Sequence, residues 1–333
     1  MPDLRPPLDP ATAHIRRAVR AALEPLRGAT VLVALSGGTD SLALTAAVAF
    51  EAPRLDVTAI AVTVDHALQD GSDAVAGTAA AAAGGLGLRT RIVRVTVDTE
   101  GGPEAAARTA RYDALREVAE EESASAVLIA HTLDDQAETV LLGLARGAGA
   151  TSLSGMPTAR PDEKSDVTWL RPLLAVRRAE TAAACAAASL EPWHDPHNDD
   201  SRFARVRARQ LVLPQLESEL GPGIAEALAR TADQLREDAE AFAEMIEETI
   251  EDIVEHAEAG IAVSVAALAA NPAALRHRII RHVVASEFGQ SLTRAQTLEV
   301  ARLVTDWSGQ GPLDLPGCRA ARVSSRIVFT ATP

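Results

Sequence analysis

The chain is poor in the residues that mark membrane, secreted or metal-stapled proteins. Its 333 residues include only 2 Cys and 3% aromatic residues. Cys185 and Cys318 stand far apart, so the sequence has neither a disulfide framework nor a zinc or CxxC redox spacing. No apolar run approaches the roughly 20 residues of a membrane span. Charged residues stand in the first twenty positions where a signal peptide would have an apolar core. We therefore expect a cytoplasmic protein without a membrane contact.

Lysine is the scarcest charged residue, because Lys164 is the only one and every other strong base is arginine. A Walker-type phosphate loop needs a lysine within its glycine loop, so that device is excluded. The formal net charge of -14 argues at first against a nucleic acid partner. The acids are concentrated, however, since residues 217–258 hold fourteen acids and two arginines. Residues 261–333 hold eight arginines and four acids, which leaves RNA open as a partner.

Short β-branched runs alternate with Ala-rich stretches over the first half of the chain. We expect buried strands at 29–35, 57–64, 90–97 and 126–130, and helices at 41–50, 72–83, 104–122 and 134–145. This alternation predicts an α/β fold with a doubly wound parallel sheet, whose ligands lie beyond the carboxyl ends of the strands.

The length and the change of pattern near Leu216 predict two domains, 1–215 and 216–333. The second domain is expected to be smaller and mainly helical. Apolar residues at spacings of 3, 4 and 7 predict a long acidic helix over about 223–259. A last strand is expected at 326–330.

A phosphate-binding loop is expected directly after the first strand, at Ser36, Gly37, Gly38, Thr39, Asp40 and Ser41. Two glycines let the backbone pass close to a ligand, and three hydroxyls add donors without charge. The free amides of the following helix N-terminus could hold a pyrophosphate. The alternative is an ordinary helix cap, since Ser, Gly and Asp are favoured there in any case.

This SGGTDS segment resembles the pyrophosphate-binding loop of the PP-loop ATP pyrophosphatase superfamily. Its members cleave ATP between the α- and β-phosphates to adenylate a substrate. The resemblance implies ATP as cosubstrate. The loop does not choose among GMP synthetases, asparagine synthetases, tRNA thiolases and tRNA(Ile)-lysidine synthetases.

Two further segments are similar to the lysidine synthetases. Residues 64–68 (VDHAL) resemble that family's VDHGL, and residues 103–112 (PEAAARTARY) resemble its EAAAR…RY helix. Arg108 and Arg111 are three residues apart, as a clamp for a phosphate or carboxylate would require. The alternative is a solvated arginine face in which Glu104 pairs with Arg108.

The most specific segment is HTLDDQAET, with His131, Asp134, Asp135 and Glu138 directly after the fourth strand. It resembles the lysidine synthetase signature closely. Carboxylates at a helix start can simply complement the helix dipole. Asp40, Asp134 and Asp135 could instead bind Mg²⁺, or the carboxylates could bind an amine. The segments at 146–156, 171–174 and 195–198 continue the resemblance.

An arginine cluster closes the first domain, with Arg202, Arg205, Arg207 and Arg209 in eight residues. It resembles the family's RNRIR run, with Val206 where Asn is usual. Such a cluster could hold an RNA backbone. The alternative is a boundary segment that pairs with the acidic helix after it.

The resemblance, to a short form of the family, implies ligation of L-lysine to the wobble cytidine of tRNA(Ile) with a CAU anticodon. The C2 oxygen of the cytidine would attack the α-phosphate of ATP, and the lysine amine would then attack C2. Arg108 and Arg111 would stabilise phosphate charge, and His131, Asp134, Asp135 or Glu138 would orient or deprotonate the amine. A homodimer is a further expectation. The alternatives are a tRNA thiolase, a small-molecule adenylating ligase and a silent nucleotide-binding module.

Overall fold

The structure is a computed structural model that describes residues 8–67, 71–96, 103–147, 149–257 and 260–332. The chain divides into two compact units, Met1–Arg236 and Glu237–Pro333. Each unit is described by itself. The sequence placed a boundary near Leu216, before the long helix that the two units share.

The first unit is built on a six-stranded sheet of order β3-β2-β1-β4-β6-β5. All neighbouring strands run parallel except the β5–β6 pair. The strands are β1 (Thr30–Ala34), β2 (Thr58–Asp65), β3 (Arg89–Arg94), β4 (Ala124–Leu128), β5 (Ala159–Pro161) and β6 (Thr168–Leu170). The parallel sheet with helices on both faces confirms the predicted fold class.

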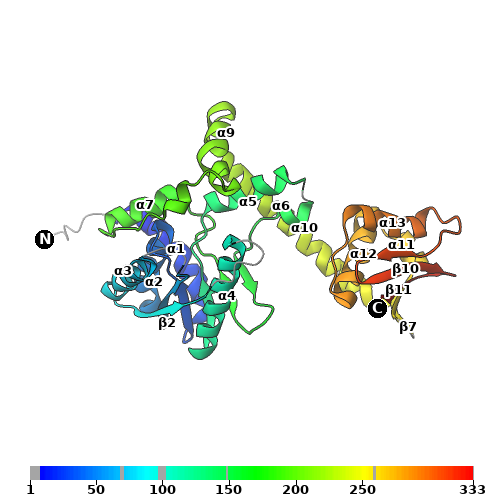
Figure 1. Ribbon diagram of the computed structural model, residues 1–333, viewed down its shortest axis with the longest axis horizontal. Coiled ribbons are helices and arrows are strands. Elements are labelled where there is room, and N and C mark those ends of the chain that lie inside the picture. Colours follow the sequence, from blue (N-terminus) through cyan, green and yellow to red (C-terminus); the bar gives the residue numbers. More distant parts are fainter. Residues whose placement is uncertain (1–7, 68–70, 97–102, 148, 258–259, 333) are drawn as a thin grey trace. The chain divides into compact units, whose positions relative to one another are not determined.

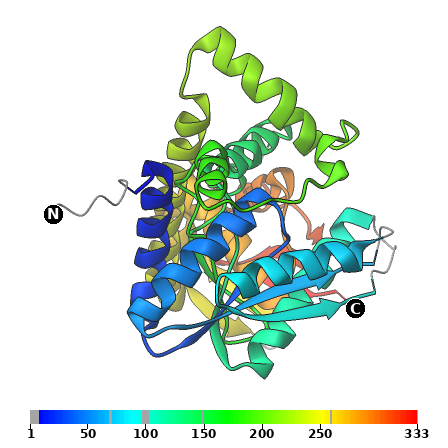
Figure 2. The ribbon, with the colours of Figure 1, turned by 90° about the vertical axis from the view of Figure 1, so that its left-hand side faces the viewer.

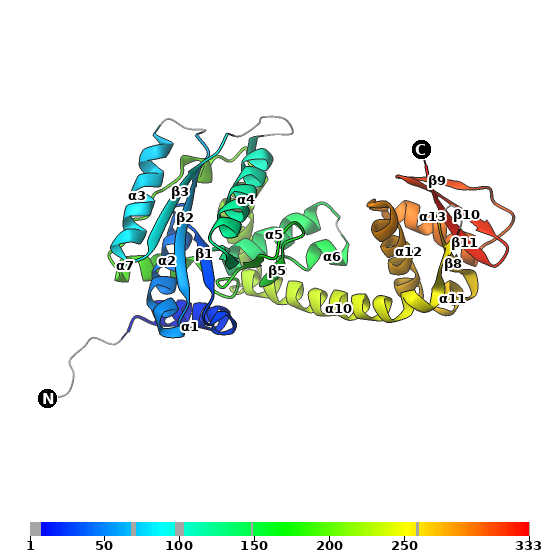
Figure 3. The same cartoon turned by 90° about the horizontal axis from the view of Figure 1, so that it is seen from below.

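Helices cover both faces of this sheet (Figures 1, 2 and 3). One face packs on side chains of four helices, with Val31, Val33 and Leu128 in the core. These are α1 (Pro10–Leu23), α2 (Thr39–Glu51), α3 (Ser72–Gly85) and α7 (Arg178–Ala187). The other face packs on α4 (Pro103–Glu121), where Leu115 meets Leu32 and Trp169. The strands β1, β2 and β4 are largely buried and therefore read as apolar runs. The prediction of a buried strand at 90–97 was wrong about burial, because β3 lies at the edge of the sheet and none of its residues is fully buried.

The remaining helices of this unit follow β4 and β6 in the chain. They are α5 (Leu133–Ala145), α6 (Ala150–Leu153), α8 (Ala204–Arg207) and α9 (Leu213–Leu220). A π-helical turn at Ala208–Val212 joins α8 to α9. The short edge strand β5 was not predicted, because three exposed residues carry no periodicity.

The second unit combines helices with a five-stranded sheet of order β7-β8-β11-β10-β9. Its strands are β7 (Val254–Ala257), β8 (Gly260–Ser264), β9 (Leu313–Leu315), β10 (Cys318–Val323) and β11 (Arg326–Ala331), and its helices are α11 (Val265–Ala270), α12 (Ala273–Phe288) and α13 (Arg294–Thr305). The last strand agrees with the prediction, whereas the strands before it were not foreseen. No helix in the described part of the chain is long and apolar enough to span a membrane.

The long helix α10 (Ile224–Ile253) ends earlier than the sequence predicted. The predicted helix ran to about residue 259, but Val254–Ala257 forms β7, which pairs antiparallel with β8. Gly260 begins β8 with φ +155, and a Cβ there would lie 1.9 Å from the carbonyl oxygen of Phe329. Strand pairing in this sheet therefore overrides the helical pattern beyond Ile253.

Phe329 is fully buried between the sheet and the helices of the second unit. We expect Phe329→Ala to lower the free energy of unfolding of this unit by about 3–5 kcal/mol, because it leaves a cavity that the core cannot refill. Urea denaturation followed by circular dichroism measures the change. Val323→Ala on the exposed end of β10 is the matched control and should cost less than about 0.5 kcal/mol. Equal losses for the two variants would contradict this core.

Candidate active site

Three neighbouring strands end at one edge of the sheet and bring the predicted residues together. The phosphate loop follows β1, His66 follows β2, and His131 stands between β4 and α5. Because β2, β1 and β4 are adjacent and parallel, the residues at their carboxyl ends lie side by side. Residues 36–41, 64–67 and 131–139 therefore lie at one edge of the sheet, and Leu68 of the predicted segment lies outside the described residues.

The phosphate loop is held open by its own hydroxyls. Ser41 Oγ donates to the Gly38 carbonyl (2.9 Å) and lies 3.1 Å from Ser36 Oγ. Gly37 has φ +84, a conformation that favours glycine. The Gly37 carbonyl accepts from the amide of Trp193 at 2.9 Å, so the 190s segment fixes the loop. The first amides of α2 have no acceptor within their own helix and remain available for an anion.

Asp40 in the first turn of α2 is bound by α7. Thr181 Oγ1 donates to Asp40 Oδ1, and Arg178 Nε donates to Oδ2 at 3.4 Å. Burial raises the pKa of Asp40, while Thr181 and Arg178 lower it in part. Burial makes an ionised carboxylate at this position unfavourable, and the hydrogen bonds and charge supplied by Thr181 and Arg178 of α7 offset part of this cost.

The carboxylates of α5 begin with a capping box. Asp135 Oδ2 accepts from the backbone amide (2.8 Å) and the hydroxyl (2.9 Å) of Thr132, the N-cap residue. Thr132 is completely buried and Asp135 nearly so. One carboxylate oxygen of Asp135, Oδ2, therefore caps the helix, and the other, Oδ1, is free to bind a cation.

Three arginines surround Asp135 and Glu138. Glu138 is fully buried and accepts from Arg178 Nη1 (3.2 Å), Arg205 Nε (2.9 Å) and Arg209 Nε (2.7 Å). The same three guanidinium groups lie 2.8 to 3.5 Å from Asp135 Oδ1. Burial alone would lower the pKa of Arg178, but the carboxylates around it raise the pKa by more than burial lowers it. The pKa of Arg178 is therefore raised above its usual value. The result is a buried network in which charges of both signs are paired.

Asp134 lies at the rim of this network. Its Oδ2 accepts from the backbone amide of Arg178 (2.7 Å), and its Oδ1 lies 3.3 Å from Arg177 Nη2. A small cavity of about 130 Å³ reaches Asp134 and Glu138, and Arg177, Arg209 and Glu217 also line it. Of the three α5 carboxylates, Asp134 thus has the fewest contacts with cations.

Arg108 and Arg111 form a second group with the two histidines, His66 and His131. Burial lowers the pKa of Arg111, of His66 and of His131, the last to about 3. Arg111 contributes to the lowered pKa of both histidines. The Nδ1 atoms of His66 and His131 are buried without a hydrogen-bond partner. Arg108 is exposed, with Nη2 3.4 Å from the Tyr112 hydroxyl; the Glu104 side chain lies outside the described part of the chain.

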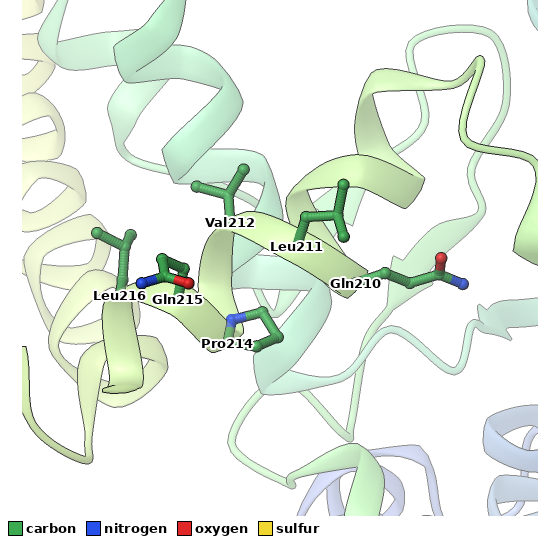
Figure 4. A pocket seen from close by; sticks show the side chains of 6 residues that line it. All are labelled: Gln210, Leu211, Val212, Pro214, Gln215 and Leu216. Atoms are coloured by element: carbon green, nitrogen blue, oxygen red, sulfur yellow. The ribbon is translucent and has the colours of Figure 1, made fainter. Parts of the chain in front are cut away.

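The arginine cluster at 202–209 divides into two pairs. Arg205 and Arg209 point into the α5 carboxylates, whereas Arg202 pairs with Asp200 at 2.6 Å and Arg207 donates to the Ser201 carbonyl. The alternative interpretation was pairing with the acidic helix, but within the described part of the first unit none of these four arginines has an ion pair with a residue of α10. Beside Arg209 lies a shallow hollow of about 600 Å³. Figure 4 shows the side chains that line it: Gln210, Leu211, Val212, Pro214, Gln215 and Leu216.

Comparisons with known proteins identify the family. A family model described as a PP-loop domain matches residues 11–216, and one described as the TilS substrate binding domain matches residues 264–328. A tRNA(Ile)-lysidine synthase of Leifsonia xyli is 54% identical over 91% of this chain and 90% of its own length. That of Thermobifida fusca is 48% identical over 94% of this chain and 95% of its own. The chain belongs to the tRNA(Ile)-lysidine synthase family. The fold is also similar to that of a U34-tRNA thiolase from Methanococcus maripaludis (TM-score 0.57, 20% identity, covering 68% of this chain and 80% of that one).

The geometry does not fit a Mg²⁺ ion held by Asp40, Asp134 and Asp135. Asp40 and Asp135 both bind the guanidinium of Arg178, and Asp134 is engaged by Arg177. Among the described residues, no three His, Cys, Asp or Glu side chains are gathered as metal ligands. Oxygen ligands that already bind guanidinium groups would have to lose them before they could bind a cation.

Two residues of the site were not predicted: Arg178, which joins Asp40 of the phosphate loop to α5, and Thr181, which binds Asp40. Neither stands in a segment quoted for the synthases, and α7 reads as an ordinary Ala-rich helix. A signal was present, because buried carboxylates require cations and the pair Arg177-Arg178 opens that helix. The backbone contact between Trp193 and Gly37 had no signal in the sequence.

The buried Glu138 carboxylate and the three arginines that bind it stabilise one another. We expect Glu138→Ala to lower the free energy of unfolding of the first unit by about 3 kcal/mol, because three part-buried cations lose a shared anion. Thermal and urea denaturation measure the loss. Glu163→Ala, at an exposed residue of the β5–β6 connection, is the control and should change stability little. A Glu138 variant as stable as the Glu163 variant would mean that the network does not hold the fold.

Proposed function

We propose that this chain ligates L-lysine to C2 of the wobble cytidine of tRNA(Ile) with a CAU anticodon, with formation of AMP and pyrophosphate. The observation that carries the proposal is the near full-length match to tRNA(Ile)-lysidine synthases, with a substrate-binding domain model on the second unit. The phosphate loop and the α5 segment lie at one sheet edge, where such a ligase needs them.

The first step would be attack of the cytidine C2 oxygen on the α-phosphate of ATP. The α2 amides and the hydroxyls of Ser36 and Ser41 would hold the phosphates. Negative charge grows on the phosphates as pyrophosphate leaves. Arg111 lies near His66, and Arg108 lies over the ring of Tyr112. These two arginines would place positive charge beside the phosphate loop, on the side of α4.

The second step would be attack of the lysine side-chain amine on the adenylated C2, which expels AMP. A neutral amine beside a carboxylate can give up its proton as it attacks. Asp134 is the best-placed group for this role, because it borders the 130 Å³ cavity and has the fewest cation contacts. Asp135 and Glu138 would act indirectly, by fixing the arginines. His131 would be neutral and could donate or accept a single hydrogen bond.

RNA would meet arginines in both units. On α12 and α13, Arg278 and Arg294 lie close enough to Arg281 to lower its pKa, after the larger effect of burial. No carboxylate in the described part of the chain pairs with Arg281 or Arg294. In the first unit, Arg207 donates to the backbone carbonyls of Ser201 and Arg202, whereas Arg202 is paired with Asp200 and would have to leave that carboxylate to bind a phosphate. Unpaired arginines are the usual phosphate contacts of an RNA-binding surface.

The other candidate functions have less support. Thiolation generally needs a reactive cysteine, and Cys185 is buried with a pKa raised to about 11 by burial and by Asp40. A ligase for small molecules alone has less support, because the near full-length relatives are tRNA(Ile)-lysidine synthases. Three expectations remain predictions: a cytoplasmic location, association into a homodimer, and a Mg²⁺ ion that accompanies the ATP phosphates. No step of the reaction is assigned to the ion.

Transfer of radioactive lysine to tRNA tests the proposal. With ATP, we expect label on a tRNA(Ile) transcript with a CAU anticodon and none without ATP. A transcript with UAU in the anticodon is the control, because it lacks the cytidine that is adenylated. Absence of label with folded protein, or equal label on both transcripts, would reject lysidine formation.

Ser41→Ala tests the phosphate loop. It removes the hydroxyl that bonds the Gly38 carbonyl and approaches Ser36, so the loop loses its fixed shape. We expect kcat/KM for ATP in lysine transfer to fall about 10- to 100-fold, the size of effect typical for a positioning contact. Thr78→Ala, at an exposed residue of α3, should leave kcat/KM unchanged. An unchanged kcat/KM for Ser41→Ala would remove the loop from ATP binding.

A further inference from the structure

Asp40 stands at the N-terminus of α2, where its carboxylate and a phosphate ligand could bind the same backbone amides. It stands in the first turn of α2, where a carboxylate ordinarily turns back to accept from the amides of its own helix. In this structure both of its oxygens are bound by α7 instead, Oδ1 by Thr181 and Oδ2 by Arg178. The amides at the start of α2 are therefore left for another anion.

Arg178 is not equally important to all of its partners. Asp135 and Glu138 each have two further arginines, Arg205 and Arg209. For Asp40, Arg178 is the one cation within ion-pair distance in the described part of the chain. Loss of the guanidinium would thus leave the α5 carboxylates paired but would leave Asp40 as an uncompensated anion at the phosphate loop.

We propose that Arg178 is a positioning residue for ATP: it holds Asp40 away from the N-terminus of α2 and balances its charge, so that the triphosphate can occupy the loop. Thr181, one turn along α7, supports the same orientation. This inference rests on the proposed use of ATP by this loop. It assigns to α7 a role in nucleotide binding and gives Arg178 no contact with the reacting atoms.

The electrostatic argument has two parts. The positive end of α2 attracts a carboxylate and a phosphate alike, so an Asp40 that is released from α7 would compete for the same amides. An unbalanced negative charge a few ångströms from a triphosphate also repels it, and the part-buried position of Asp40 weakens screening by solvent. Both effects weaken ATP binding and leave the α5 network in place.

Calorimetric titration with α,β-methylene-ATP, which is not cleaved between these phosphates, measures the binding step alone. We expect Arg178→Met to raise Kd about tenfold or more, the range for loss of one well-placed charge partner. Arg178→Lys, which keeps the charge but not the fork of donors, should lie between wild type and Arg178→Met. Thr181→Val should raise Kd less, because it removes one hydrogen bond and no charge.

A matched control separates nucleotide binding from folding. Arg20 pairs with the fully buried Glu51 at 2.8 Å in the same unit and is not part of the phosphate loop. Arg20→Met should lower thermal stability and leave Kd for the nucleotide unchanged. Circular dichroism shows which variants are folded at the temperature of the titration, and Thr181→Val and Arg178→Lys still test the inference if Arg178→Met is not folded.

The deciding experiment removes the charge of Asp40 from the Arg178→Met protein. If Arg178 acts by balancing Asp40, the double variant Asp40→Asn/Arg178→Met should bind the nucleotide more tightly than Arg178→Met alone, in EDTA as well as in Mg²⁺. A Kd of the double variant equal to or higher than that of Arg178→Met, or an unchanged Kd for Arg178→Met, would overturn the inference. Failure of the wild-type protein to bind the nucleotide would instead reject ATP as the ligand of the proposed function.

Discussion

The site depends on the burial of one carboxylate, Glu138, among three guanidinium groups. A carboxylate with no exposed surface is tolerated only when cations accompany it into the interior. Those cations come from α7 and from the run around Arg205 and Arg209, which stand 40 to 71 residues further along the chain. One ionised group therefore ties three separate segments to the carboxyl edge of the sheet.

This network sorts the charges around the phosphate loop. On the α5 side, carboxylates and arginines are paired, so that side presents little net field to a ligand. On the α4 side, Arg108, Arg111 and Arg171 stand among neutral groups such as Tyr112 and His131. In the proposed reaction, a polyanion bound over the loop would therefore be attracted toward α4. The pairing of α5 with its arginines makes this possible, since uncovered carboxylates at the same edge would repel it.

The sequence was a good guide wherever a local pattern determines the structure. Apolar runs predicted β1, β2 and β4 because strands buried on both faces are rich in apolar residues, and the loop at 36–41 followed from its place between strand and helix. The position of β3 was also predicted, but its burial was not, because the sequence does not say which strand lies at the edge of the sheet. The contacts of Arg178 could not be predicted, because spacing along the chain does not say which buried anions a distant cation will meet. The end of α10 was mispredicted for a related reason: the pairing of β7 with β8 is a property of the folded sheet, and the helical periodicity does not contain it.

The cations of this network are all arginines, and the geometry of Arg178 shows why a lysine could not take its place. Arg178 uses three nitrogens for three carboxylates, Nε for Asp40, Nη2 for Asp135 and Nη1 for Glu138. An ammonium group carries all its donors on one atom and could not reach carboxylates on α2 and α5 in this arrangement. Arginine also keeps its charge when buried, whereas a buried lysine shifts its pKa and can lose the proton. A site that we propose admits a neutral lysine amine as substrate is therefore built with cations that do not titrate, so that its own charge stays fixed while the charge of the substrate changes.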